Sequence, residues 1–114
     1  MVAITYVSTD ELPRDVISRD FIGERFGGVG ACVLFIDAAP GEGPRLHRHP
    51  YAELLLVLEG TATFYDGTGS REVNAGEMAV VEPGQAHGFK NTGDGILRQV
   101  DIHLSPRFET EWLE

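Results

Sequence analysis

Short runs of β-favouring residues, separated by turns that contain glycine or proline, limit how this chain can fold more than any other feature. The 114 residues include 14 Gly and 6 Pro, and these lie between runs rich in Val, Ile, Phe, Thr and Leu. No stretch of about 15 residues carries a helical apolar stripe free of Gly and Pro. The pattern predicts an all-β domain with strands at Val2–Val7, Ala31–Asp37, Glu53–Leu58, Thr61–Tyr65, Arg71–Val73, Met78–Val81, His87–Lys90 and Ile96–Leu104. The strands predict a closed barrel or a two-sheet sandwich.

The remaining segments are predicted to be accessory to this domain. Pro106–Leu113 is the one helical candidate, and the glycines and charges of Asp10–Gly30 favour an irregular arm laid over the barrel. We find no internal repeat and no linker, so we expect a single domain over residues 1–114.

Charge and cysteine content exclude several classes of partner. Nine Lys and Arg against eighteen Asp and Glu give a net charge of −9, which argues against nucleic acids and anionic membrane surfaces. No run of about 18 apolar residues could cross a bilayer, and Asp10 and Glu11 interrupt the apolar stretch that a signal peptide would need. Cys32 is the single cysteine and lies in an apolar run, which predicts a buried, inert thiol. We therefore expect a cytoplasmic protein without disulfides.

Three histidines and one glutamate have the spacing of a metal site. His47 and His49 alternate with Arg48, so on a strand both imidazoles point to the same side, about 7 Å apart along the chain. Glu53 opens the apolar run LLLVL, where a buried carboxylate needs a partner. His87 follows the Pro83-Gly84 turn and arrives from another strand. These four residues predict one bound metal ion, and their N/O donor set favours Fe, Mn, Ni, Zn or Cu over Ca.

Both segments resemble the two motifs of the cupin superfamily. Gly41–Gly60 fits G-x5-H-x-H-x3-E-x6-G at all five fixed positions, a coincidence with a chance on the order of 10⁻⁵ to 10⁻⁴ at average residue frequencies. Gly76–Asn91 fits G-x5-P-x-G-x2-H-x3-N at its glycines, histidine and asparagine, but Pro83 stands one position after the expected proline. This departure affects the turn and leaves His87 in register.

The resemblance implies both a fold and a site. It implies a cupin-type jelly-roll β-barrel (double-stranded β-helix), with His47, His49, Glu53 and His87 as the metal ligands. It also implies a homodimer, to which Val2–Val7 could contribute by adding a strand to the partner's sheet.

Further residues are candidates for contact with a substrate. Alternation places Gln99 and His103 on one face of the last long strand; if that face lines the lumen, His103 is a candidate catalytic residue. The more continuous apolar face of Val100, Ile102 and Leu104 favours the opposite arrangement, with His103 outside, although the family also includes a functional histidine on a strand after motif two. Arg45 shares the parity of His47, and Phe89 that of His87, so the substrate-binding candidates are Arg45, Phe89 and Gln99.

Three functions are consistent with these residues. The first is a metal-dependent enzyme, a dioxygenase or an isomerase or lyase, that acts on a small, partly apolar organic substrate; four protein ligands leave two positions open on an octahedral ion. The second is a non-catalytic small-molecule-binding or sensing module. The third is a metal-independent sugar-nucleotide epimerase, which would need a lumenal His–Asp pair and basic residues; the intact ligand set and the single lysine, Lys90, argue against it.

Overall fold

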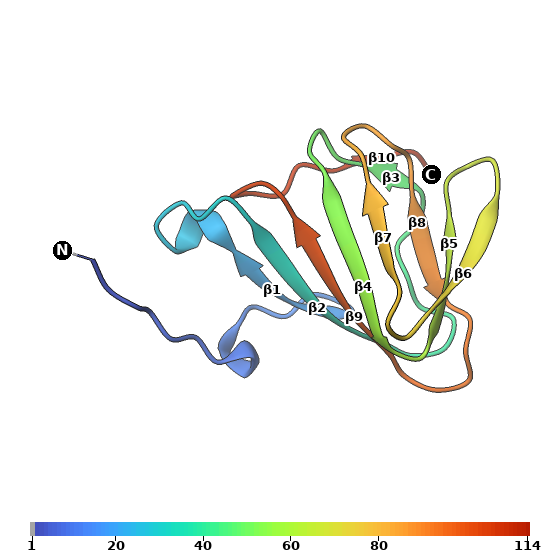
Figure 1. Ribbon diagram of the computed structural model, residues 1–114, viewed down its shortest axis with the longest axis horizontal. Helices are drawn as coiled ribbons and strands as arrows, with labels where there is room; N and C mark the ends of the chain where they lie inside the picture. Colours follow the sequence, from blue (N-terminus) through green and yellow to red (C-terminus); the bar gives the residue numbers. More distant parts are fainter. Residues whose placement is uncertain (1) are drawn as a thin grey trace.

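Two antiparallel sheets face each other in the computed structural model, which describes residues 2–114 (Figure 1). The strands are β1 (Ser18–Ile22), β2 (Cys32–Ala38), β3 (His47–Arg48), β4 (Glu53–Glu59), β5 (Thr61–Tyr65), β6 (Ser70–Asn74), β7 (Met78–Val81), β8 (Gly88–Asn91), β9 (Leu97–His103) and β10 (Glu111–Trp112). The only helical elements within residues 2–114 are two short 3₁₀ turns, η1 (Thr9–Glu11) and η2 (Gly23–Arg25). None of the helices in this range is long and apolar enough to span a membrane.

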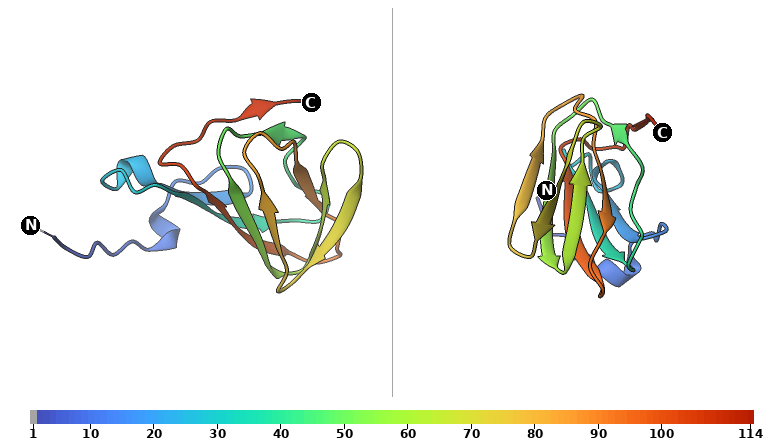
Figure 2. Two further views of the ribbon diagram at one scale, coloured as in Figure 1. Left: turned by 45° about the horizontal axis from the view of Figure 1, so that its top comes forward. Right: turned by 90° about the vertical axis from the view of Figure 1, so that its right-hand side faces the viewer.

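The larger sheet has the strand order β1-β2-β9-β4-β7, and the smaller one has the order β6-β5-β8. β3 and β10 form a separate pair across one end of the molecule (Figure 2). The sheets do not join into a closed ring, so the fold is a jelly-roll barrel, or double-stranded β-helix, that is open between its sheets. The apolar core lies between them and consists of Ile36, Ala38, Leu55, Val57, Ala62, Val73, Val81, Phe89 and Leu97.

Strict alternation along β9 decides which side chains face the interior. Leu97, Gln99, Asp101 and His103 are buried, whereas Arg98 is exposed and Val100 and Ile102 are half-buried on the outer face. The favoured sequence interpretation, with His103 outside, is therefore wrong. The prediction assumed that the more apolar face of β9 points inward. In the structure the inner face lines a polar site and the outer face of the sheet is apolar.

Three other expectations fail at the ends of the chain. Val2–Val7 forms no strand and extends away from the body of the molecule (Figure 1). Pro106–Leu113 forms no helix, because it runs extended to β10, where Trp112 pairs with His47 and the Leu113 N–H donates to the Leu46 carbonyl. Asp10–Gly30 contains a regular strand, β1, that pairs with β2 along its whole length. Alternation of apolar residues does not reveal this strand, because its inward-facing residues include Ser18 and Asp20.

The last residue of motif one, Gly60, is required by the turn between β4 and β5. Its φ of 87° lies in the left-handed region, which non-glycine residues enter only at a cost. A Cβ atom at this position would lie 2.6 Å from the carbonyl oxygen of Ile96. Both constraints fix the exit of β4, the strand that begins at Glu53.

Candidate metal centre

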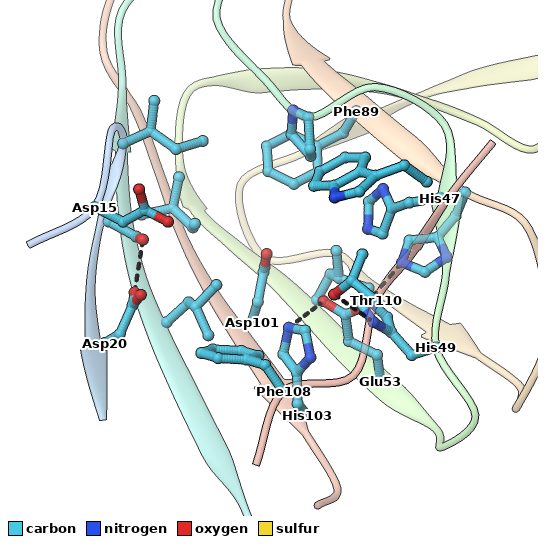
Figure 3. A pocket seen from close by; sticks show the side chains of 18 of the residues that line it. Asp15, Asp20, His47, His49, Glu53, Phe89, Asp101, His103, Phe108 and Thr110 are labelled. Carbon is cyan, nitrogen blue, oxygen red and sulfur yellow. Dashed lines mark hydrogen bonds and ion pairs between the residues drawn. The ribbon is translucent and has the colours of Figure 1, made fainter. Parts of the chain in front are cut away.

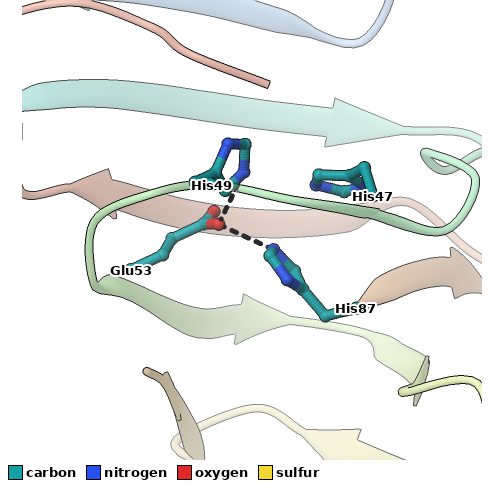
Figure 4. A group of neighbouring side chains, drawn as sticks. All are labelled: His47, His49, Glu53 and His87. Carbon is teal, nitrogen blue, oxygen red and sulfur yellow. Dashed lines mark hydrogen bonds and ion pairs between the residues drawn. The ribbon is translucent and has the colours of Figure 1, made fainter. Parts of the chain in front are cut away.

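The four predicted ligands converge inside the barrel (Figure 4). One potential ligand atom from each of His47, His49, Glu53 and His87 lies within 4.8 Å of the others, and all four side chains are buried. His47 belongs to β3, Glu53 begins β4 and His87 directly precedes β8. The structure thus brings together the four residues that the sequence groups as candidate ligands.

A backbone bridge holds the two motifs together at this point. The His47 N–H donates to the His87 carbonyl at 2.9 Å, and the His87 N–H donates to the His47 carbonyl at 2.8 Å. Nearby, the Gly84 N–H donates to the His49 carbonyl at 2.8 Å, which ties the Pro83-Gly84 turn to the first motif. The shifted proline therefore leaves His87 in place beside the first motif.

Backbone carbonyls set the tautomer of all three histidines. Nδ1 of His47 lies 2.6 Å from the Arg45 oxygen, that of His49 lies 2.9 Å from the Glu109 oxygen, and that of His87 lies 2.9 Å from the Gln85 oxygen. A carbonyl oxygen can only accept, so each Nδ1 must carry the proton. A neutral ring then presents its Nε2 lone pair to the interior, which is the arrangement required of a metal ligand.

Those lone pairs face the carboxylate of Glu53. Its Oε1 lies 2.8 Å from His87 Nε2 and 3.2 Å from His49 Nε2, and the buried His49 Nε2 has no hydrogen-bond partner. Donor atoms bound to a metal at 2.0–2.2 Å are separated by about 3 Å when cis and about 4 Å when trans. The spacing and chemistry of the four donors therefore fit a divalent transition-metal ion.

Burial and mutual contact shift the pKa values of these groups in different directions. Burial alone would raise the pKa of Glu53, but the surrounding imidazoles of His103, His49 and His87 outweigh it, and the pKa falls well below its usual range. Burial lowers the pKa of His47 to about 4. For His87 burial also acts downward, but the hydrogen bond to Glu53 more than offsets it and the pKa rises. The carboxylate thus stays ionised, and His47 stays neutral near pH 7.

His103 lies on the other side of the same carboxylate. Its Nε2 is 3.1 Å from Glu53 Oε2, and its Nδ1 is 2.8 Å from the Tyr51 hydroxyl. Burial raises the pKa of Tyr51 to about 12, so the hydroxyl is protonated and can donate to Nδ1. Because its Nδ1 partner is a hydroxyl and not a carbonyl, His103 can carry its proton on Nε2 and donate it to Glu53. This contact allows His103 to orient the Glu53 carboxylate.

A cavity of about 290 Å³ opens in front of the centre (Figure 3). Phe89 and His103 line it, as the sequence analysis allowed, and Trp112 covers His47 with ring centroids 5.1 Å apart. Two of the substrate-binding candidates, Arg45 and Gln99, do not line this cavity. Arg45 is exposed and lies over the Trp112 ring, 5.6 Å from its centroid. Gln99 is buried, does not line the cavity, and donates to Asp101 at 2.7 Å.

Several residues of the site were missed by sequence reasoning. Asp101 lines the cavity and shares the face of His103, so the alternation of β9 contained the signal for it. Phe108 and Thr110 reach the cavity from the C-terminal segment, where no local pattern marks them. Tyr51 belongs to the site because its hydroxyl contacts His103 Nδ1.

A double-stranded β-helix with three histidines and a glutamate converging inside it defines a class of metal-binding barrel proteins. The family model described as the cupin domain matches residues 34–103, more than half of the chain. The chain belongs to the cupin family. A search of curated proteins finds no match.

Solved structures share the fold over most of the chain. An uncharacterized conserved protein with a double-stranded beta-helix domain from Klebsiella pneumoniae has 24% identity and a TM-score of 0.78, covering 98% of this chain and 99% of its own. The polyketide cyclase RemF from Streptomyces resistomycificus has 18% identity and a TM-score of 0.80, covering 98% of this chain and 87% of its own. The oxalate decarboxylase of Bacillus subtilis, whose Mn(II) centres have been studied, has 19% identity and a TM-score of 0.75; the match covers 91% of this chain but 30% of that longer one.

Proposed function

We propose that this cupin is a metal-dependent enzyme that acts on a small organic substrate at the centre formed by His47, His49, Glu53 and His87. The single observation that carries the proposal is that four buried donor atoms, within 4.8 Å of one another, lie at the wall of a cavity large enough for a small molecule. With these four protein ligands, a six-coordinate ion would keep two positions for water or a substrate. When bound, the ion would supply a Lewis acid or a site for dioxygen.

The protein's own residues supply binding and orientation around this centre. The backbone carbonyls fix the histidine tautomers, His103 holds the Glu53 carboxylate, and Phe89, Phe108 and Trp112 give the cavity apolar walls. A cavity with apolar walls beside a polar centre suits a partly hydrophobic ligand. The reaction classes that fit are dioxygenation and isomerisation or lyase chemistry on carbonyl compounds, and two enzymes of similar fold, a polyketide cyclase and an oxalate decarboxylase, are consistent with such a role.

A non-catalytic binding or sensing module is the second candidate, because the same cavity could hold a ligand without turnover. The epimerase alternative loses support. Asp101 and His103 both face the lumen, but His103 contacts Glu53 and Tyr51, and among residues 2–114 no lysine or arginine lines the cavity to hold a diphosphate.

Elemental analysis of tag-free protein purified without chelators, beside a His87→Ala variant, tests the proposal first. We expect about one transition-metal ion per chain in the natural protein and a loss in the variant. Iron would direct the next assays to oxygen uptake with catechols, diketones and thiols; manganese, nickel or zinc would direct them to carbonyl isomerisation and cleavage. Tight binding without turnover across both panels would favour the binding module, and failure to take up any metal after reconstitution would refute the metal centre.

A further inference from the structure

Apart from its histidines, the ionisable side chains that line the cavity are all acids. They are Asp15, Asp20, Glu53 and Asp101, and no lysine or arginine in residues 2–114 lines the cavity with them. A divalent ion bound to Glu53 would leave a local charge of about +1. That charge can hold one negative group of a ligand, but a second negative group would find no lysine or arginine of residues 2–114 in the lining and would lie near carboxyl groups.

Asp101 is a buried acid that faces the cavity between its two ends (Figure 3). Asp101 is 3% exposed, and Gln99 Nε2 donates to Asp101 Oδ1 at 2.7 Å. In residues 2–114 no other hydrogen bond or ion pair reaches this carboxyl group. Burial, followed by the charge of Glu53, raises its pKa well above the usual range. A protonated Asp101 has a hydroxyl to donate to an oxygen of a ligand bound near the metal.

The wall opposite the histidines carries a second polar group. Ser18 Oγ donates to Asp20 Oδ1 at 2.6 Å, and Figure 3 shows Asp20 and Asp15 across the cavity from His47 and His49. Asp20 forms no ion pair with a basic residue in residues 2–114. A half-buried carboxylate without a cationic partner can accept hydrogen bonds from a hydroxyl or an ammonium group of a ligand.

The sheet register gives the distance between these polar groups. Asp20 pairs with Leu34, and Leu34 pairs with Asp101, so two strand spacings separate the acids, about 10 Å along the sheet. The surfaces between them are apolar and include Leu34, Ile36 and Phe108. A ligand that touches both ends is therefore elongated, with an apolar middle.

We propose that the cavity selects an elongated molecule with a chelating oxygen pair at the metal end, an apolar middle, and a hydroxyl or ammonium group that binds to Asp20 at the opposite end. Asp101 contacts the ligand near its chelating end. A ligand whose far end carries a carboxylate is disfavoured, because that group would meet Asp20. This inference rests on the metal centre of the proposed function and adds the class of ligand.

Three catechol probes with the same chelating end and different two-carbon tails test the inference. Their tails end in an ammonium (dopamine), a hydroxyl (hydroxytyrosol) or a carboxylate (3,4-dihydroxyphenylacetate), and unsubstituted catechol is the reference. Dissociation constants are measured by calorimetry, without oxygen, on the natural protein with its metal, on Asp20→Asn, and on Asp94→Asn. Asp94 is an exposed acid outside the cavity lining and is the matched control.

We expect the ammonium and hydroxyl probes to bind about tenfold more tightly than the carboxylate probe, the effect of one favourable polar contact. Asp20→Asn should reduce the ammonium-to-carboxylate ratio to about threefold or less, leave the affinity for catechol unchanged, and thereby show that the metal end is intact. Asp94→Asn should behave as the natural protein. Equal binding of ammonium and carboxylate probes, an unchanged ratio in Asp20→Asn, or no binding to protein that holds its metal would each overturn the inference. Protein that cannot hold a metal would overturn the proposed function and, with it, this inference.

Discussion

His87 Nε2 and Glu53 Oε1 lie 2.8 Å apart inside the barrel, although the Nδ1 proton of His87 is committed to the Gln85 carbonyl. A neutral His87 would therefore direct a lone pair at a carboxylate oxygen, which is repulsive. A cation must lie between the two atoms, either a second proton on the imidazole or a metal ion. The raised pKa of His87 is the first of these two solutions, and metal binding is the second.

Glu53→Gln tests this relationship directly. The amide keeps the shape of the side chain, removes the charge, and can donate an N–H to the Nε2 lone pair of His87. We expect metal affinity to fall by about 100-fold or more, because a neutral amide is a poor ligand, while the metal-free protein stays folded. Elemental analysis and thermal unfolding of the metal-free protein measure the two effects. Full metal occupancy in this variant would show that the carboxylate is not a ligand.

Metal affinity should depend on pH with a definite sign. The pKa of His87 is raised above its ordinary value of 6.5, whereas that of His47 is lowered to about 4. As pH falls toward 6, protons therefore compete with the metal at His87, and His47 joins only near pH 4. We expect affinity to drop by about tenfold for each pH unit below the His87 pKa, as one proton is displaced.

Competition with a chromophoric chelator at pH 5, 6, 7 and 8 measures this dependence. A slope of one proton between pH 6 and 5 would agree with His87 as the titrating ligand. Undiminished affinity at pH 5 would contradict the assignment of histidine ligands.

His103→Ala should weaken the metal centre without abolishing it. The 3.1 Å contact between His103 Nε2 and Glu53 Oε2 orients the carboxylate, and the loss of such a partner costs about 10- to 100-fold in metal affinity. Tyr51→Phe should have a smaller effect, because it removes only the hydrogen bond to His103 Nδ1. Lys90→Ala, at an exposed position on β8, is the control. Complete loss of metal in His103→Ala would make His103 a ligand.

The grouping of the four candidate ligands and the fold class could be predicted because they depend on local spacing. His47 and His49 share a face through strand alternation, and the two motifs bring Glu53 and His87 to the same region whatever the flanking chain does. The turns that separate the strands are encoded by single residues such as Gly60. These features can be recognised from the order and spacing of residues in the sequence.

The remaining parts of the site depend on tertiary context. Val100 and Ile102 form the more apolar side of β9, so the sequence favours His103 on the outer face. In the structure the inner face of β9 is the polar one, because it lies beside the polar centre. Arg45 has the parity of His47 but precedes β3, where strand alternation does not hold. Trp112 and its neighbours reach the site through pairing of β10 with β3, a contact between residues more than 60 positions apart that no local pattern predicts.

Gly60→Ala should destabilise the protein. A residue with a Cβ atom would have to hold a φ of 87° and approach the Ile96 carbonyl at 2.6 Å. We expect a loss of about 1–3 kcal/mol in the free energy of unfolding, measured by urea denaturation of the metal-free protein. Gly95→Ala is the matched control, because a Cβ atom there meets open space. Equal stability of the two variants would show that the turn adapts without cost.

The outer face of the larger sheet carries a continuous apolar surface. The register aligns residues of β2, β9, β4 and β7 that point away from the core; they are Val33, Phe35, Val100, Ile102, Leu54, Leu56, Met78 and Val80. Met78 is 51% exposed and Val80 is 69% exposed. An apolar surface of this extent on the outside of a protein marks an interaction site. It is also uncharged in a chain of net charge −9, so it is the surface on which two like-charged copies can meet with least repulsion.

We therefore expect the chain to form a dimer through this face, with the same surface contributed by each copy. Val80→Glu places a charge within the apolar surface, on its edge strand β7, and should shift the protein to a monomer, as measured by sedimentation equilibrium over a range of concentrations. Val29→Glu adds the same charge at a residue that is 50% exposed in a loop outside any strand, and this variant should remain dimeric. Because Val80 points away from the cavity, metal content should be the same in both variants. A natural protein that is monomeric at all concentrations, or a Val80→Glu variant that still dimerises, would show that this face has another role.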